Sequence, residues 1–216
     1  MPGIFISFEG PDGAGKTTAL NSLLPKLKAL TTQEIVVSRE PGGSPIAEKI
    51  RDIILDVNEE GMDDRTEALL YAAARRQHLI DVILPTLNAG KIMLSDRFVD
   101  SSIAYQGGGR EIGEKEVASI NDFAIDGHLP DLTIYFDISP EVGLSRIRKD
   151  HQEAMDRLEK ASLDFHERVH DSYLKLVKAN PERIQTIDAN QAPDKVVSDA
   201  IKSMQKRFPN VFNGGQ

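Results

Sequence analysis

The sequence has no cysteine and no hydrophobic run long enough to cross a membrane. The absence of cysteine excludes disulfides and cysteine-ligated metals, and it fits a protein of a reducing compartment. A membrane-spanning helix needs about 20 consecutive apolar residues, and no stretch comes close to that length. The first residues, MPGIFISFEG, also lack the basic region and long apolar segment of a signal peptide. We therefore expect a soluble, cytoplasmic protein.

Positive charge is also scarce, with 26 lysines and arginines against 34 acidic residues and a net charge of −8. This balance repels nucleic acids and anionic membranes, so neither is expected as a partner. An anionic ligand would have to be held by a few local arginines and by backbone amides. The 216 residues, 40% of them hydrophobic, suffice for one core, so we expect a single domain over residues 1–216.

Short apolar segments alternate with longer amphipathic ones along the chain. The apolar segments, typical of strands buried on both faces of a parallel sheet, are Gly3–Glu9, Glu34–Arg39, Lys91–Ser95, Leu132–Asp137 and Arg183–Asp188. Helices are predicted over Lys16–Leu30, Ser44–Val57, Asp64–Ala89, Glu114–Ile125, Pro140–Asp150, Ser162–Ala179 and Pro193–Arg207. The alternation predicts an α/β fold with an open, doubly wound parallel sheet of five strands and helices on both faces. Such sheets bind ligands at the carboxyl ends of their strands.

The segment GPDGAGKT, after the first predicted strand, has the spacing of a phosphate-binding loop. Gly10, Gly15, Lys16 and Thr17 match G-x-x-x-x-G-K-[ST] between a strand and a helix, as the motif requires. Backbone amides and the helix N-terminus would bind phosphate. Lys16 would reach the β- and γ-phosphates, and Thr17 would ligate Mg²⁺. The motif predicts ATP or GTP binding, but it does not explain why an anion-binding loop contains an acid, Asp12.

A phosphate-binding loop occurs in switch GTPases, motors and small-molecule kinases alike. A GTPase needs a base-reading N-K-x-D motif after a late strand, whereas that turn reads DANQAPD here. The sequence therefore favours adenine, which would lie against Ala189–Pro193.

Residues suited to a second, anionic substrate follow the second predicted strand. Arg39 and Glu40 end this strand before a Gly-Gly turn, and Arg51 lies in the next helix. Tyr71 and Arg75 share a helical face, which would let a ring stack on a nucleobase while a guanidinium bonds its edge. Taken alone, this pair is better explained by a core tyrosine beside a solvated arginine.

The segment SDRFVDSSIAYQGGGR follows the third predicted strand. Asp96 could hold metal-bound water there, and Arg97 could bind phosphate. We interpret the glycine run as a loop, and a loop flanked by Gln106 and Arg110 is more often a binding loop than a bare connection.

The segments FEGPDGAGKTT, REPGG, YAAARR, DR with SSIAYQGGGR, PDLTIYFDISPEVGL and DRLE occur here in the order and spacing seen in thymidylate kinases. The sequence therefore resembles this family, its bacterial type above all, from about Ile4 to Ile201. The resemblance implies a P-loop kinase fold of the nucleoside monophosphate kinase type, with strand order 2-3-1-4-5. It also implies a homodimer that transfers the γ-phosphoryl group of MgATP to dTMP, giving dTDP and ADP.

The resemblance assigns residues to both substrates. The ATP-binding residues would be Gly10, Pro11, Asp12, Gly13, Ala14, Gly15, Lys16, Thr17, Thr18 and Arg146. The dTMP-binding residues would be Asp12, Arg39, Glu40, Pro41, Arg51, Tyr71, Arg75, Arg97, Ser102, Tyr105 and Gln106. Thr17 and Asp96 would hold Mg²⁺, partly through water. The catalytic residues would be Lys16, Arg97, Arg157 and Asp12.

The resemblance also implies individual roles on the acceptor side. Tyr71 would stack on thymine, where the family usually has Phe, and Arg75 would bond the base edge with Ser102 and Gln106. Tyr105 would crowd the sugar C2′ position and disfavour ribose. The acceptor phosphate would be held by Arg51 and Arg97, in a site shaped by Arg39 and the Glu40–Pro41 turn. Asp12 would meet the sugar 3′-hydroxyl or metal-bound water.

Some members of the family carry an arginine in the phosphate-binding loop, next to the acid. This sequence has Gly13 at that position and so lacks the positive charge. Phosphoryl transfer spreads negative charge over the migrating group, so a cation has to come from elsewhere. The polar segment LSRIRKDHQEAMDRLEKAS is typical of a lid, placed at about 146–160. Arg157 in DRLE matches the lid arginine of the bacterial type and is the predicted transition-state clamp, with Arg146 second and Arg148 and Lys149 nearby.

The segment HERVH matches the H-E-x-x-H zinc-protease motif by its letters. His166 and His170 would share a helical face. A catalytic zinc needs a third protein ligand, and the sequence offers no convincing one. We therefore interpret this segment as a charged surface helix.

Three other functions stay open from the residues alone. A kinase for another nucleoside monophosphate is disfavoured by Tyr71, Arg75 and Tyr105. A regulatory module that binds a nucleotide without turnover is disfavoured by Lys16, Arg97 and Arg157, which such a module would not need. A zinc protease is the third and least favoured.

Overall fold

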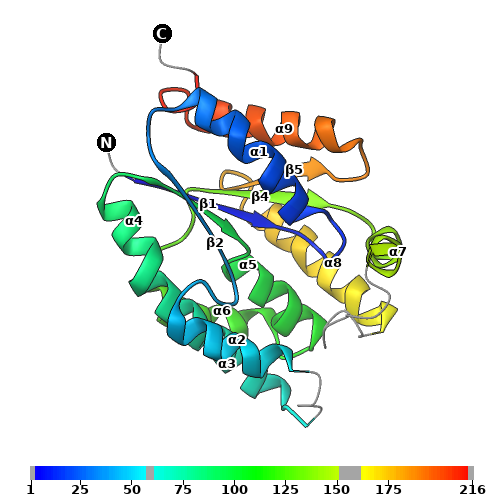
Figure 1. Cartoon of the computed structure of the whole chain (residues 1–216). Coiled ribbons are helices and arrows are strands. Elements are labelled where there is room, and N and C mark those ends of the chain that lie inside the picture. The colour runs from blue at the N-terminus through cyan, green and yellow to red at the C-terminus, as the bar shows by residue number, and fades with distance from the viewer. Residues whose placement is uncertain (1–2, 57–60, 151–161, 214–216) are drawn as a thin grey trace.

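The computed structural model describes residues 3–56, 61–150 and 162–213. Its five strands are β1 (Ile4–Glu9), β2 (Ile35–Arg39), β3 (Ile92–Asp96), β4 (Leu132–Asp137) and β5 (Ile184–Asp188). They form one parallel sheet in the order β2-β3-β1-β4-β5 (Figure 1). The predicted sheet and its strand order are confirmed, and the strand bounds differ from the prediction by one residue at most.

Helices cover both faces of this sheet. The helical segments are α1 (Lys16–Leu30), α2 (Pro45–Leu55), α3 (Asp64–His78), η1 (Leu79–Ile83), α4 (Leu84–Asn88), α5 (Val99–Ser102), η2 (Ile103–Gly109), α6 (Glu114–Ile125), α7 (Pro140–Asp150), α8 (Leu163–Ala179) and α9 (Pro193–Arg207). Helices α1 and α9 lie together on one face, whereas α4, α5, α6 and α8 lie on the other (Figure 1). None of the helices in the described part of the chain is long and apolar enough to cross a membrane.

The central strands carry apolar side chains on both faces because successive side chains of a strand point to opposite sides. In β1, Ile4, Ile6 and Phe8 pack into the core beneath α1 and α9, whereas Phe5 packs into the opposite core. The expectation that every strand is buried on both faces is wrong for the two edge strands, β2 and β5. In β2 one face remains partly open and Val37 is exposed, and in β5 Thr186 is exposed.

The predicted helix Asp64–Ala89 is helical throughout residues 64–88 but is not uniform. Its middle turn, η1, is a π-helix in which the Leu84 amide donates to the carbonyl of Leu79. Pro85 follows at once and has no amide hydrogen, so a regular α-helical bond is impossible there. The wider turn accommodates the proline without ending the helix.

The segment after β3, interpreted above as a loop, is helical, and that interpretation is wrong. It forms α5 and the π-helix η2, which packs against α8. A Cβ atom on Gly108 would lie 2.7 Å from the Cβ of Ser172, and one on Gly109 would lie 2.7 Å from the ring of Phe165. The glycine run therefore permits a close approach of two helices.

Candidate active site

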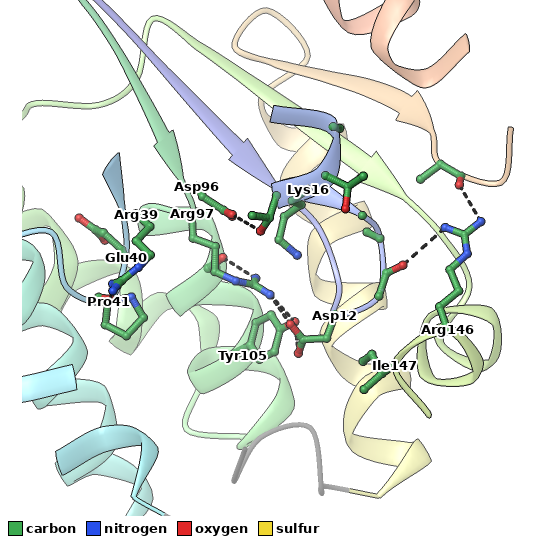
Figure 2. A pocket seen from close by; sticks show the side chains of 18 of the residues that line it. Asp12, Lys16, Arg39, Glu40, Pro41, Asp96, Arg97, Tyr105, Arg146 and Ile147 are labelled. Atoms are coloured by element: carbon green, nitrogen blue, oxygen red, sulfur yellow. Dashed lines mark hydrogen bonds and ion pairs between the residues drawn. The ribbon is translucent and has the colours of Figure 1, made fainter. Parts of the chain in front are cut away.

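A cavity of about 720 Å³ lies at the carboxyl ends of β1, β2 and β3 (Figure 2). Most of the residues predicted from the sequence line it. They are Asp12, Gly13, Ala14, Gly15, Lys16, Thr17, Thr18, Arg39, Glu40, Pro41, Arg51, Tyr71, Arg75, Asp96, Arg97, Ser102, Tyr105, Gln106 and Arg146. Gly10 and Pro11 are not among the lining residues, and Arg157 lies outside the described residues.

The phosphate-binding loop turns tightly around the side chain of Lys16. The Lys16 ammonium is buried and donates to the carbonyls of Gly10 and Pro11, at 2.9 Å each. Gly10 has a φ of 145°, and a Cβ atom there would lie 2.6 Å from the carbonyl oxygen of Phe136. Burial, with the charge of Arg97 adding to it, lowers the pKa of Lys16 to about 8.

Asp12, the acid inside this loop, points at a basic partner across the cavity (Figure 2). It forms a salt bridge with Arg97 and accepts a hydrogen bond of 2.8 Å from the Tyr105 hydroxyl. Burial alone would raise the pKa of Asp12, but Arg97 and Lys16 outweigh it and hold that pKa below its usual value. Asp12 is therefore an ionised group that fixes Arg97 and Tyr105 relative to the loop.

Arg97 gathers further contacts at the end of β3. Its guanidinium donates to the Gly10 carbonyl at 3.1 Å and to the Ser101 hydroxyl at 2.9 Å. It also lies over the Tyr105 ring, 4.9 Å from the centroid. Arg97 thus has a defined position between the phosphate-binding loop and α5.

Two oxygen ligands suited to a hard cation meet where α1 begins. The Thr17 hydroxyl donates to Asp96 Oδ2 at 2.7 Å. Mg²⁺ is commonly bound through one or two protein oxygens together with substrate phosphates and water, so this pair fits such an ion. Among the described residues, no group of three His, Cys, Asp or Glu side chains could hold a metal by itself.

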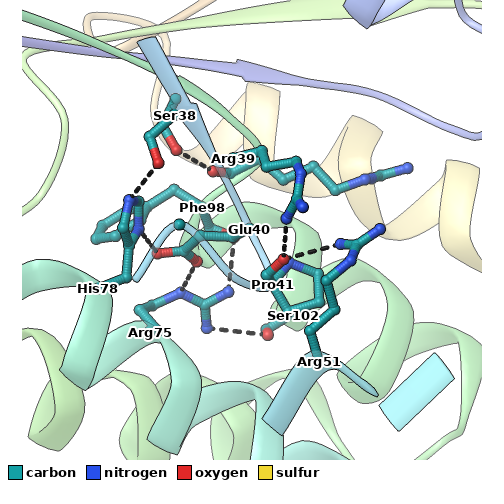
Figure 3. Close-up of polar contacts among 12 residues, drawn as sticks. Ser38, Arg39, Glu40, Pro41, Arg51, Arg75, His78, Phe98 and Ser102 are labelled. Atoms are coloured by element: carbon teal, nitrogen blue, oxygen red, sulfur yellow. Dashed lines mark hydrogen bonds and ion pairs between the residues drawn. The ribbon is translucent and has the colours of Figure 1, made fainter. Parts of the chain in front are cut away.

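In the turn after β2, one carbonyl group accepts hydrogen bonds from two arginines. The oxygen of Pro41 accepts from Arg51 at 2.8 Å and from Arg39 at 3.1 Å (Figure 3). The preceding residue, Glu40, is buried and is bonded to Arg75 Nε at 2.7 Å and to His78 Nδ1 at 3.0 Å. The end of β2 and the helix α2 therefore place two cations, Arg39 and Arg51, side by side at the cavity wall.

Arg75 is almost completely buried, so the interpretation of it as a solvated arginine is wrong. Besides Glu40, its guanidinium donates to Ser102 at 3.0 Å, to Asn121 and to the carbonyl of Phe98 at 3.1 Å. Tyr71, one turn earlier on α3, is also buried and lines the cavity. The two side chains form part of the cavity wall from one helical face, as their spacing predicted.

At the other end of the cavity, Arg146 of α7 faces the loop after β5. Its guanidinium donates to the carbonyl of Ala189 at 3.1 Å (Figure 2). Gln191 and Pro193 line the cavity next to it. This is the segment against which the sequence placed an adenine ring.

Residues 8–200 match the family model for thymidylate kinase. The chain belongs to the thymidylate kinase family. It is 58% identical to the thymidylate kinase of Latilactobacillus sakei subsp. sakei over 98% of this chain and 99% of that protein. It is 54% identical to the thymidylate kinase of Enterococcus faecalis over 98% of this chain and all of that protein. The crystal structure of thymidylate kinase from Ehrlichia chaffeensis is similar with a TM-score of 0.76 and 32% identity, covering 95% of this chain and all of that one.

The structure explains why position 13, an arginine in some thymidylate kinases, is glycine in this family member. Gly13 has a φ of 75°, which side chains other than glycine rarely adopt. A Cβ atom on it would lie 2.1 Å from the carbonyl oxygen of Gly143 in α7. An arginine at this position would therefore require α7 to move away from the loop.

Several residues of this thymidylate kinase site were missed by the sequence reasoning. Glu9, fully buried at the end of β1, accepts from the Phe98 amide at 2.7 Å, from the Ser101 hydroxyl and from the Tyr173 hydroxyl at 3.0 Å. Burial, and then the charge of Asp100, raises the pKa of Glu9 to about 7. Its position as the last residue of a buried strand could have identified Glu9, but no local pattern identifies Tyr173.

The HERVH segment lies in α8, and its interpretation as a surface helix is only half right. His166 is buried along with Phe165 and Val169, so one face of the helix belongs to the core. His170 lies on the same side but is partly exposed, with its Nε2 atom 2.8 Å from Asp137 Oδ1. Helix α8 therefore packs one face into the core and is joined through His170 to the end of β4.

Proposed function

We propose that this protein is a dTMP kinase, which transfers the γ-phosphoryl group of ATP to dTMP and releases dTDP and ADP. The observation that carries the proposal is one cavity shared by a phosphate-binding loop and a cluster of arginines, with Asp12 and Arg97 paired between them. Membership of the thymidylate kinase family supports it. Catalysis then consists of holding two phosphates in line and stabilising the charge that develops between them.

On the donor side, the loop amides and Lys16 would bind the β- and γ-phosphates. Arg146 and the Ala189–Pro193 segment would lie along the adenosine. Thr17 and Asp96 are the residues that would hold Mg²⁺. When bound, this ion neutralises negative charge on the phosphate oxygens of ATP.

On the acceptor side, Arg39, Arg51 and Arg97 would hold the phosphate of dTMP. Tyr71 would stack on the base, and Arg75 with Gln106 would face the edge of the base. These residues line the same cavity. The attacking phosphate is already ionised, so no strong base is required of the protein.

The sugar would lie against Asp12 and Tyr105, which are joined to each other by a hydrogen bond. An ionised Asp12 can accept a hydrogen bond from a 3′-hydroxyl. The Tyr105 ring would crowd the C2′ position and so disfavour a ribonucleotide.

The remaining cation would come from a lid at about 146–160, with Arg157 as the clamp on the migrating phosphoryl group. The backbone at Gly13 supports a clamp from the lid rather than from the loop, because it leaves no room for an arginine in the loop. In this proposal residues 1–216 act as a single kinase domain.

We also infer a homodimer in the cytoplasm. Helices α2, α3 and α6 lie beside one another (Figure 1). They carry exposed apolar side chains, including Ile53, Leu69 and Phe123, the last 90% exposed. A second copy of the chain would cover these side chains. The lack of cysteine supports a reducing compartment.

A coupled assay of ADP release across dTMP, dUMP, AMP, CMP, UMP and GMP tests the activity. We expect dTMP to have the highest kcat/KM. A preference for AMP or CMP would instead indicate a different nucleoside monophosphate kinase. No transfer to any monophosphate at saturating ATP and Mg²⁺ would leave a nucleotide-binding module.

A further inference from the structure

The amide of Gln106 is held in one orientation by a buried acid of α3. Glu67 is fully buried and accepts a hydrogen bond from Gln106 Nε2 at 2.9 Å. An ionised carboxylate can only accept hydrogen bonds, so the NH₂ end of the amide has to face it. Because the amide group is planar, its oxygen points away from Glu67. Gln106 itself lines the cavity.

Arg110 supplies the counter-charge of Glu67. Its Nη2 atom donates to Glu67 Oε2 at 3.1 Å, and its Nε atom lies 3.4 Å from Oε1. The guanidinium also lies over the ring of Phe165, 5.1 Å from the centroid. Glu67 therefore bonds Gln106 through Oε1 and is paired with Arg110, most closely through Oε2.

We propose that Glu67 is a specificity-determining residue, which makes Gln106 a hydrogen-bond acceptor towards the base and so selects a pyrimidine with a hydrogen at N3. The inference rests on the proposed function, in which Gln106 faces the base edge of the acceptor nucleotide. Thymine and uracil carry a donor at N3, whereas N3 of cytosine is an acceptor. An amide oxygen facing the cytosine N3 leaves two acceptors without a hydrogen between them. Sites built around one hydrogen bond reject the analogue that cannot form it.

The variant Glu67→Gln tests this assignment. Arg110 would bond the oxygen of the new amide, which leaves the NH₂ group of residue 67 towards Gln106. Gln106 would then turn its oxygen to that group and present its own NH₂ to the base. The ratio of kcat/KM for dTMP over dCMP should fall about 10- to 100-fold, mainly through a higher KM for dTMP. The ratio for dTMP over dUMP should not change, because both bases carry the same N3–H group.

A matched control uses the same arginine. Asp64 also pairs with Arg110, at 3.4 Å from its Nε atom, so Asp64→Asn removes a carboxylate from that arginine and leaves the bond between Glu67 and Gln106 in place. Its dTMP over dCMP ratio should match that of the unaltered protein. In a Gln106→Ala background, Glu67→Gln should cause no further change, because it acts only through that amide. Thermal unfolding shows that each variant is folded.

An unchanged dTMP over dCMP ratio in folded Glu67→Gln would overturn the inference, as would an equal fall for dTMP over dUMP. If Glu67→Gln does not fold, Gln106→Ala carries the test, and an unchanged ratio there rules out the amide as the reader of N3. Failure of the unaltered protein to phosphorylate dTMP would instead refute the proposed function.

Discussion

Lys16 is a buried cation whose pKa should respond to the charge of the ligand in the loop. In the free protein its pKa is lowered to about 8, by burial first and by Arg97 second. Bound phosphates favour the charged form and raise that pKa. We therefore predict that ATP binding takes up protons near pH 8, and that ATP affinity decreases as the pH rises above about 8.

Calorimetry at pH 8 in buffers of different ionisation enthalpy measures this proton uptake. The Lys16→Arg variant is the control, because arginine stays protonated at this pH. Equal uptake by the variant and the unaltered protein would assign the proton to another group.

Arg157 is the residue proposed to clamp the migrating phosphoryl group. Replacing it by alanine should lower kcat by on the order of 10³, because a clamp on the transition state contributes little to ground-state binding. The KM for dTMP should change little. Steady-state kinetics measures both constants, and Arg148→Ala, from the same polar segment, is compared as an alternative clamp. An unchanged kcat in Arg157→Ala would move the role to Arg146 or Arg148.

At the scale of elements, α8 is joined to the end of β4 by the pair of His170 and Asp137. The hydrogen bond and charge of Asp137 raise the pKa of His170 from its ordinary value near 6.5, while the His170 hydrogen bond lowers the pKa of Asp137. The His170 contribution is fully present below about pH 6.5 and is lost as the pH rises through the raised value. The Asp137 contribution is present above about pH 4 and is lost under more acidic conditions.

The variant His170→Gln should therefore be more destabilising at pH 5.5 than at pH 8.5. The difference should be about 0.5 kcal/mol, because both side chains are partly exposed to solvent. Urea unfolding at the two pH values measures it. His128→Gln is the matched control, since the imidazole of His128 contacts the carbonyl of Ile125. The same pH dependence in both variants would show that the ion pair is not its source.

The elements themselves were largely predictable because their signals are local. The alternation of apolar and polar residues located all five strands and most helices to within two residues. The glycine run at residues 107–109 was misread, since glycine permits both a turn and a close helix contact. Only the position of α8 shows that the second use applies here.

At the scale of the whole molecule, the apolar side chains of α2, α3 and α6 predict the assembly. Phe123→Asp would place a charge in the proposed interface, where it could not be solvated, and should convert the dimer to a monomer. Sedimentation or light scattering with chromatography measures the mass. Leu174→Asp is the matched control, because Leu174 is also exposed but lies on α8. If Phe123→Asp remains a dimer, the interface lies elsewhere. The same conclusion follows if both variants become monomers to the same extent.

The sequence by itself determined the parallel sheet, its strand order by family resemblance, and the phosphate-binding loop. The strands and the loop depend on residues a few positions apart, because strand periodicity and the loop geometry are local, whereas the strand order followed from motifs spread along the chain. Only the tertiary structure joined Gln106 to Glu67, 39 positions away, and Tyr173 to Glu9, 164 positions away. Nothing near these residues in the chain indicates their partners, since such contacts arise only when the elements pack. The partners of the acid in the loop emerged in the same way, because Arg97 and Tyr105 reach Asp12 only in the folded chain.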